Sequence, residues 1–183
     1  MLTLAAPPRD HAELTPAATT QAAAVADALL ATSRVLVALA ASSIVHVDAE
    51  VTLVQFRGLV VLASRGPQRT VDLAVELEVA PSTATRMCDR LVRRDLVRRY
   101  RRMEDRRATW VGLTERGRDL VGQVMHHRQA AIGELVRATP VADPEILVAA
   151  LDAFVRTAGE TPESQWWLRW EVSTTPPPDT VTA

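Results

Sequence analysis

The sequence predicts a mainly α-helical protein with one small β-hairpin. Apolar residues recur at helical spacing along most of the chain, while β-prone residues are confined to two short runs near residue 100. Of the 183 residues, 48% are hydrophobic, which is enough to bury a sizeable core. The length fits one domain, or two small halves that share a core.

The N-terminal part predicts a leader followed by two helices. Residues 1–15 are broken by prolines and lack periodicity, so we expect a flexible leader. From Pro16 to Val47 the chain is rich in alanine, with apolar residues at near-helical spacing, and this predicts a long amphipathic helix. A second helix is expected over 52–65, where Gly66-Pro67 stops it.

Two shorter helices follow, separated by a tight turn. The first is expected over 71–78 with Thr70 as N-cap, and Pro81 suits the first turn of the second. Four residues of the second helix lie at i, i+3, i+4 and i+7 and predict a buried face: Ala84, Met87, Cys88 and Leu91. Its opposite face carries hydroxyls and charges: Ser82, Thr83, Thr85, Arg86, Asp89, Arg90 and Arg93.

After Leu96 the pattern changes to two short strands, 97–101 and 108–113, joined by a charged hairpin tip over 102–107. Thr114 is expected to cap a long helix over 115–138, which ends before Pro140. The Asp143-Pro144-Glu145 sequence restarts a helix that Gly159 closes.

Two helices joined by a short turn, followed by a basic hairpin, form a winged helix-turn-helix. The second helix is thin enough to enter the major groove of DNA, and its Ser82, Thr83 and Thr85 are short enough to let the backbone approach. Arg86 can bind guanine or phosphate through two hydrogen bonds. The hairpin tip brings Arg106 and Arg107 within reach of the neighbouring minor groove.

The charge distribution supports a double-stranded DNA partner, although the formal net charge is only −1. All 21 basic residues are arginine, and 15 of them lie between Arg57 and Arg118 against 8 acidic residues, a local balance of +7. The rest of the chain carries −8. The total is therefore uninformative, because a polyanion-facing part and an acidic remainder cancel in it.

These residues resemble the MarR family of bacterial transcription regulators. The resemblance covers about residues 25–158. It rests on Phe56-Arg57, the V-D-L-A run at 71–74, P-S-T-A-T-R at 81–86, D-R-L at 89–91 and, above all, D-R-R-A-T-W-V-G-L-T-E-R-G at 105–117. Glu78 and Asp95 stand where the family usually has glycine, and Ala80 stands where a capping serine is common. These departures affect the placement of the second helix.

The resemblance implies a homodimer that grips a palindrome, commonly as a repressor, and releases it when a small, often aromatic acid binds. It assigns Arg107 to the minor groove, with Asp105 fixing the wing through an ion pair. Thr70 and Arg90 would contact phosphates. Residues of an effector site are not assigned. No cofactor is expected, and a bacterial cytoplasmic location, on the nucleoid when bound to DNA, follows from the same resemblance.

The expected domains follow this scheme. A leader (1–15) precedes a dimerisation helix (16–50), the winged helix-turn-helix lobe (51–114) and two further dimerisation helices (115–159). A Trp-rich segment (160–172) and a disordered tail (173–183) complete the chain. Trp166, Trp167 and Trp170 could line an effector pocket, but a hydrophobic plug is the favoured interpretation.

Other functions have weaker support. Cys88 could make the protein a redox-sensing regulator, but its position on an apolar face favours packing. The pair His126-His127 and the group His46, Asp48 and Glu50 lack a tight metal-ligand pattern. A winged helix that binds proteins rather than DNA is a further alternative, whereas no catalytic constellation supports an enzyme. The strongly apolar stretch over 35–47 is shorter than the ~20 residues a bilayer requires, so no membrane partner is expected.

Overall fold

A computed structural model describes the backbone of residues 16–48, 50–102 and 105–160, and their side chains except at 16–18, 102 and 105–107. The leader, the Trp-rich segment and the tail therefore lie outside the described residues. The described elements, in order, are α1 (Pro16–Val47), α2 (Leu53–Arg65), β1 (Gln68–Arg69), α3 (Thr70–Glu76), α4 (Pro81–Arg93), β2 (Val97–Arg102), β3 (Asp105–Leu113), α5 (Glu115–Ala138) and α6 (Pro144–Thr157).

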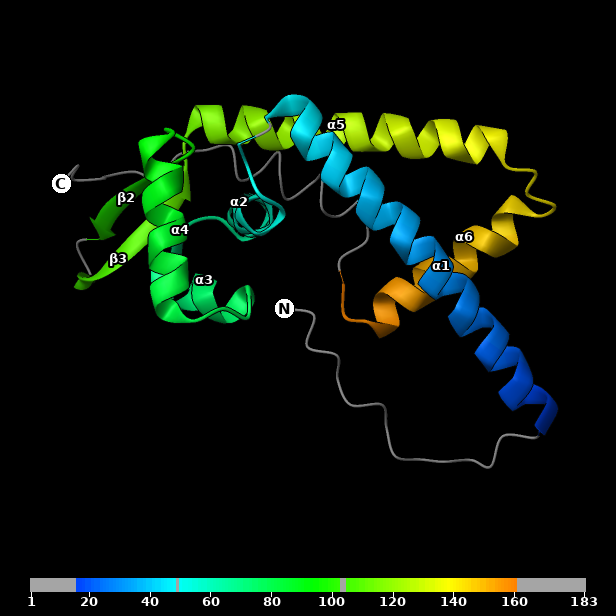
Figure 1. Ribbon diagram of the computed structural model, residues 1–183. Coiled ribbons are helices and arrows are strands. Elements are labelled where there is room, and N and C mark those ends of the chain that lie inside the picture. Colours follow the sequence, from blue (N-terminus) through cyan, green and yellow to red (C-terminus); the bar gives the residue numbers. More distant parts are fainter. Residues whose placement is uncertain (1–15, 49, 103–104, 161–183) are drawn as a thin grey trace.

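The elements form a lobe attached to long helices (Figure 1). The lobe contains α2, α3, α4 and the sheet, and it lies at the N-terminal end of α5, which extends away from it. The C-terminal end of α1 packs along α5, while the N-terminal part of α1 projects away from the lobe. The mainly α-helical fold with a small β-hairpin wing is confirmed.

Three local predictions need correction. Thr70 is the first residue of α3 rather than its N-cap, a position that Arg69 occupies without a side-chain capping hydrogen bond. Strand β3 begins at Asp105 instead of 108, because the charged tip residues still pair across the hairpin, with Arg102 opposite Asp105. The sequence also missed β1, which pairs with β3 in the sheet order β1-β3-β2. Two residues are too few to show strand periodicity.

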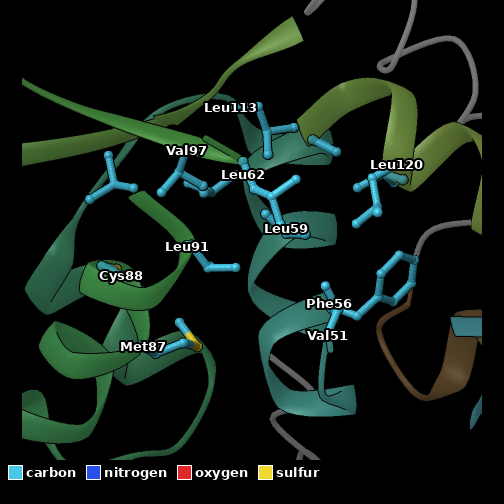
Figure 2. Packing of buried hydrophobic residues seen from close by; sticks show 14 of the residues in the cluster. Val51, Phe56, Leu59, Leu62, Met87, Cys88, Leu91, Val97, Leu113 and Leu120 are labelled. Carbon is cyan, nitrogen blue, oxygen red and sulfur yellow. The ribbon is translucent and has the colours of Figure 1, made fainter. Parts of the chain in front are cut away.

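The core of the lobe lies where α2, α4, the sheet and the start of α5 meet (Figure 2). Phe56, Leu59 and Leu62 of α2 face Leu91 of α4 and Leu120 of α5. The predicted buried face of α4 is confirmed, since all of its members are buried: Ala84, Met87, Cys88 and Leu91. Helix α4 is therefore held on its inner side by apolar packing, which leaves its polar side exposed.

Side-chain caps define the starts of three helices. Thr52 and Gln55 form a reciprocal capping box at the start of α2. The Thr114 hydroxyl accepts a hydrogen bond from the Gly117 amide at 3.0 Å, as predicted, and Asp143 caps α6 in the same way. Helix α4 begins at Ala80-Pro81 without a side-chain cap. These bonds fix where α2 and α5 enter the lobe.

Two non-glycine residues that stand where the family usually has glycine have a left-handed backbone. Glu78, in the turn between α3 and α4, and Asp95, before β2, both have φ of 55°. Such a conformation costs an ordinary side chain roughly 1–2 kcal/mol, although Asp tolerates it better than Glu. The turn of the helix-turn-helix is therefore strained at Glu78.

Replacing Glu78 by glycine should stabilise the protein. Glycine adopts positive φ without a steric penalty, and after its larger loss of chain entropy we expect a net gain of about 0.5–1 kcal/mol. Thermal unfolding should show a midpoint raised by a few degrees. Glu134→Gly, near the C-terminal end of the regular helix α5, is the control and should lower the midpoint, because glycine is a poor helix former and the ion pair with Arg137 is lost. A lowered midpoint for Glu78→Gly would contradict the assigned strain.

Helix α1 has the predicted bounds, Pro16–Val47, but its apolar run is longer than expected. Thr19–Val47 is long and apolar enough to cross a membrane by length and composition, with a mean hydropathy of 1.9 and only 11% of the window buried. The 13-residue stretch identified from the sequence was too short, because the alanine-rich segment before it adds to the apolar run. The core helix of a soluble protein and an N-terminal signal sequence pass the same test, so this feature is weak support for a membrane span.

Candidate nucleic-acid interface

The outer face of α4 presents polar side chains to solvent. Ser82, Thr83, Thr85, Arg86 and Arg90, all singled out from the sequence, are exposed. Arg86 and Arg90 are one helical turn apart and share a face. The structure thus brings these five residues together on one surface of a helix whose other side is anchored in the core.

Polar contacts hold one edge of this face against the wing strand β2. Arg99 of β2 forms an ion pair with Asp89 of α4 at 2.6 Å, and its Nη2 donates to the Thr85 carbonyl at 3.4 Å. The Thr85 hydroxyl donates to the Pro81 carbonyl at 2.9 Å, so it presents its lone pairs outward. These contacts fix strand β2 against α4.

The other edge of α4 faces a groove that sequence reasoning missed. The groove has a volume of about 390 Å³ and is lined by Thr52, Val54 and Gln55 of α2 and by Thr83, Arg86, Met87 and Arg90 of α4. Two guanidinium groups and the N-terminal end of α2 give it a positive potential. The T-x-x-Q capping pattern could have revealed where α2 begins, but only the tertiary fold places that end beside α4.

Two groups can be distinguished among the lobe's arginines. Arg65, Arg69 and Arg99 form ion pairs within the lobe. Arg69 donates two hydrogen bonds to Asp72, at 2.6 and 2.8 Å, and these bonds hold the pKa of Asp72 below its ordinary value. A second group has no ion pair within the described part of the chain: Arg86, Arg90, Arg93, Arg98 and Arg101. This second group is available to an external polyanion.

The remaining predicted site residues lie elsewhere. Thr70 is half-buried at the start of α3, and its hydroxyl donates to the Thr109 carbonyl at 3.5 Å. The side chains of Asp105, Arg106 and Arg107 lie outside the described residues, although their backbone begins β3. The wing-tip assignments therefore stay predictions.

Cys88 and two of the histidines take part in packing within and between elements. Cys88 is fully buried, and burial raises the pKa of its thiol, which disfavours the reactive thiolate. The rings of His46 and His127 stack with centroids 4.2 Å apart at the contact between α1 and α5, which neighbouring-residue patterns did not predict. Among the described residues, no group of three or more His, Cys, Asp or Glu could hold a metal ion.

Comparison with known proteins identifies one family. The MarR family model matches residues 51–109. The chain is 32% identical over 116 residues to the HTH-type transcriptional repressor MdtR of Bacillus subtilis, which covers 63% of this chain and 74% of MdtR. It is 33% identical to an uncharacterized HTH-type regulator of the same organism, YhbI, but spans only 47% of that protein's length.

The fold also matches a solved structure over most of its length. The crystal structure of RV1404 from Mycobacterium tuberculosis superposes with a TM-score of 0.72 at 43% sequence identity, and the match covers 78% of this chain and 97% of RV1404. The similarity therefore extends beyond the winged lobe into the long helices.

Proposed function

Since the chain belongs to the MarR family of transcriptional regulators, we propose that it is a homodimeric, ligand-responsive regulator, most simply a repressor, that binds a pseudo-palindromic operator. The observation that carries this proposal is the exposed face of α4, where hydroxyls and unpaired arginines lie on a helix that is otherwise buried. Phosphate contacts supply most of the affinity of such a surface, and base contacts supply its specificity.

Each site residue has a proposed role. Ser82, Thr83, Thr85 and Arg86 read or flank bases in the major groove, and Arg90 contacts a phosphate. The groove between α2 and α4 supports this docking, because its positive edge would lie against the same DNA strand. At the wing, Arg107 enters the minor groove beside Arg106, with Asp105 bracing the turn, and Thr70 contacts the backbone.

The proposed dimer buries the apolar surface of the long helices. Helix α6 has no buried residue, and Phe154, Leu151 and Ile146 are 55%, 46% and 68% exposed. Helix α1 likewise exposes Val25, Leu30, Val35, Leu36, Val37 and Val45. Apolar faces of this size are covered in stable proteins, so we assign residues 16–50 and 115–159 to dimerisation and 51–114 to DNA binding.

Replacing Phe154 by glutamate should therefore dissociate the dimer. A charge at a buried apolar contact has no partner and carries a large desolvation penalty. Sedimentation velocity at micromolar concentration should show a monomer, whereas Val71→Glu, which alters an exposed apolar residue of the lobe, should leave the dimer intact. A Phe154→Glu dimer as tight as wild type would exclude α6 from the interface.

The regulatory part of the proposal follows from family resemblance. We expect a small, aromatic acid to weaken operator binding, and a cytoplasmic location for the protein. The relative MdtR is named a repressor, which favours repression here. Cys88 does not support redox sensing as the signal, because its thiol is buried.

Genome-wide footprinting, followed by gel shifts on the recovered sites, tests the function. We expect a pseudo-palindrome with half-sites about one helical turn apart, and an affinity that falls steeply with salt. Arg107→Ala should weaken binding, and equal binding would remove the wing from the interface. Failure to recover any site, with no gel shift on the protein's own promoter, would favour the alternative of a protein-binding winged helix.

A further inference from the structure

Arg94 joins the end of the recognition helix to the end of the long N-terminal helix. It is the residue that follows α4, and its backbone amide donates to the Arg90 carbonyl at 3.2 Å. Its guanidinium Nη2 lies 2.5 Å from Oδ2 of Asp48, the residue that follows α1. The two residues are 46 positions apart in the sequence. This ion pair is a direct polar connection between the two helix ends.

The pair is partly shielded from solvent. The side chains of Arg94 and Asp48 are 22% and 17% exposed, and the more exposed Glu50 adds a second, longer contact of 3.5 Å to Arg94. Burial acts to raise the pKa of Asp48, but the Arg94 hydrogen bond, the Glu50 amide and the charges of Arg94 and Arg116 hold it below its ordinary value. Asp48 therefore stays ionised at neutral pH, where a shielded pair is stronger than an exposed one.

Among the ion pairs of the described residues, this one alone connects α1 with α4. Arg65–Glu76 joins α2 to α3, and Arg99–Asp89 joins α4 to β2. Arg69–Asp72 lies at the start of α3, and Arg137–Glu134 lies within α5. The other contacts of α1 are apolar packing, which is not directional, and, with α5, the His46–His127 ring stack and a 3.4 Å contact between the Ser43 hydroxyl and His127 Nδ1. A hydrogen-bonded pair between helix ends restricts their relative angle more narrowly than apolar packing does.

We propose that the Asp48–Arg94 pair is a positioning latch that fixes the recognition helix relative to the dimerisation helices, and so sets the half-site spacing that the dimer accepts. This inference rests on the proposed function as a dimeric DNA-binding regulator. In a symmetric dimer, the angle between α1 and α4 within each protomer determines how far apart the two recognition helices lie. If this angle is less restricted, the two recognition helices can bind half-sites over a broader range of spacings.

The latch has a consequence that distinguishes Arg94 from the arginines that contact phosphate. Asp48 already neutralises its guanidinium, so Arg94 should release few counterions when DNA binds. Removing the latch should lower affinity for the native operator without changing the slope of log K against log salt. Loss of a phosphate-contacting arginine reduces that slope by about one.

The most discriminating test replaces Asp48 rather than Arg94. Asp48→Asn keeps the side-chain oxygen that accepts from the Glu50 amide at 3.0 Å, but it removes the charge that holds Arg94. The variant is more positive by one charge, so simple electrostatics predicts tighter DNA binding. The latch predicts the opposite, with roughly tenfold weaker binding to the native operator. Glu76→Gln is the matched control, since it removes an equal charge from an ion pair within the lobe.

Operators lengthened or shortened by one base pair between half-sites supply the second readout. Wild type and Glu76→Gln should discriminate strongly against them, while Asp48→Asn should lose most of that discrimination with an unchanged salt slope. Arg94→Lys keeps a charged partner and should retain more discrimination than Arg94→Met. Circular dichroism and sedimentation verify that each variant is a folded dimer. If Asp48→Asn is not a folded dimer, the comparison of Arg94→Lys with Arg94→Met supplies the test.

The outcomes separate the two proposals. If wild type binds no operator, the proposed function fails. If wild type binds and Asp48→Asn binds as tightly, with the same preference for spacing, the latch is wrong and the proposed function stands. A reduced salt slope for Arg94→Met, with unchanged spacing preference, would instead make Arg94 a phosphate contact and overturn the latch.

Discussion

Replacing Gly117 by alanine should prevent the protein from folding stably. A Cβ at this position would lie 2.0 Å from the carbonyl oxygen of Leu96 and 2.9 Å from its carbonyl carbon. Both are backbone atoms, and the same oxygen accepts a hydrogen bond from the Thr114 amide, so the clash cannot be relieved by turning a side chain. Leu96 and Leu113 beside it are core residues, and their displacement would separate the start of β2 from the end of β3.

We expect a loss of more than about 4 kcal/mol in the free energy of unfolding, or no soluble protein. Gly133→Ala is a matched control on the same helix, because its Cβ would meet only the flexible end of Arg137 at 3.5 Å. Alanine is the better helix former, so this control should be neutral or stabilising by up to about 1 kcal/mol. Urea unfolding followed by circular dichroism compares the two, and similar stabilities would disprove the close approach at Gly117.

Gly117 also shows the limit of sequence reasoning. The residue belongs to the motif over 105–117 that indicated the family, and Thr114 was predicted as the helix cap. The need for glycine three residues later depends on how closely α5 approaches Leu96, which is a tertiary contact. The sequence predicted the position of the helix and its cap, whereas the steric reason for the glycine required the structure.

The recognition helix was the most predictable part of the molecule. Its spacing of apolar residues assigned Ala84, Met87, Cys88 and Leu91 to the core, and all four are buried. Helical periodicity depends only on local sequence, so it needs no knowledge of neighbours. The family resemblance placed Glu78 and Asp95 where glycine is usual, and both have the positive φ that glycine adopts most easily.

Contacts between elements could not be predicted in this way. The groove between α2 and α4, the His46–His127 stack and the Asp48–Arg94 pair each join residues that are far apart in the sequence. The number of arginines predicted the sign of the lobe's charge, but it did not predict which arginines form ion pairs within the lobe. The structure divides these arginines into those that hold the lobe together and those that lie open to a polyanion.

That division leads to the second large expected effect. The double variant Arg86→Ala and Arg90→Ala should weaken operator binding by about a hundredfold or more near 0.15 M salt. Both side chains are exposed, have no ion pair among the described residues and line the positive groove beside α2. Their removal leaves the core untouched, because Met87 and Leu91 carry the packing of this helix. The thermal midpoint should therefore change little.

The single variants separate the two proposed roles. Arg90→Ala should weaken binding to all sequences alike and lower the salt slope by about one, as expected for a phosphate contact. Arg86→Ala should also relax preference at one base pair of each half-site, as expected for a base contact. Arg65→Ala is the control, because it removes the same charge from a lobe residue that is already paired with Glu76. If all three variants weakened binding equally, general charge rather than the face of α4 would account for the affinity.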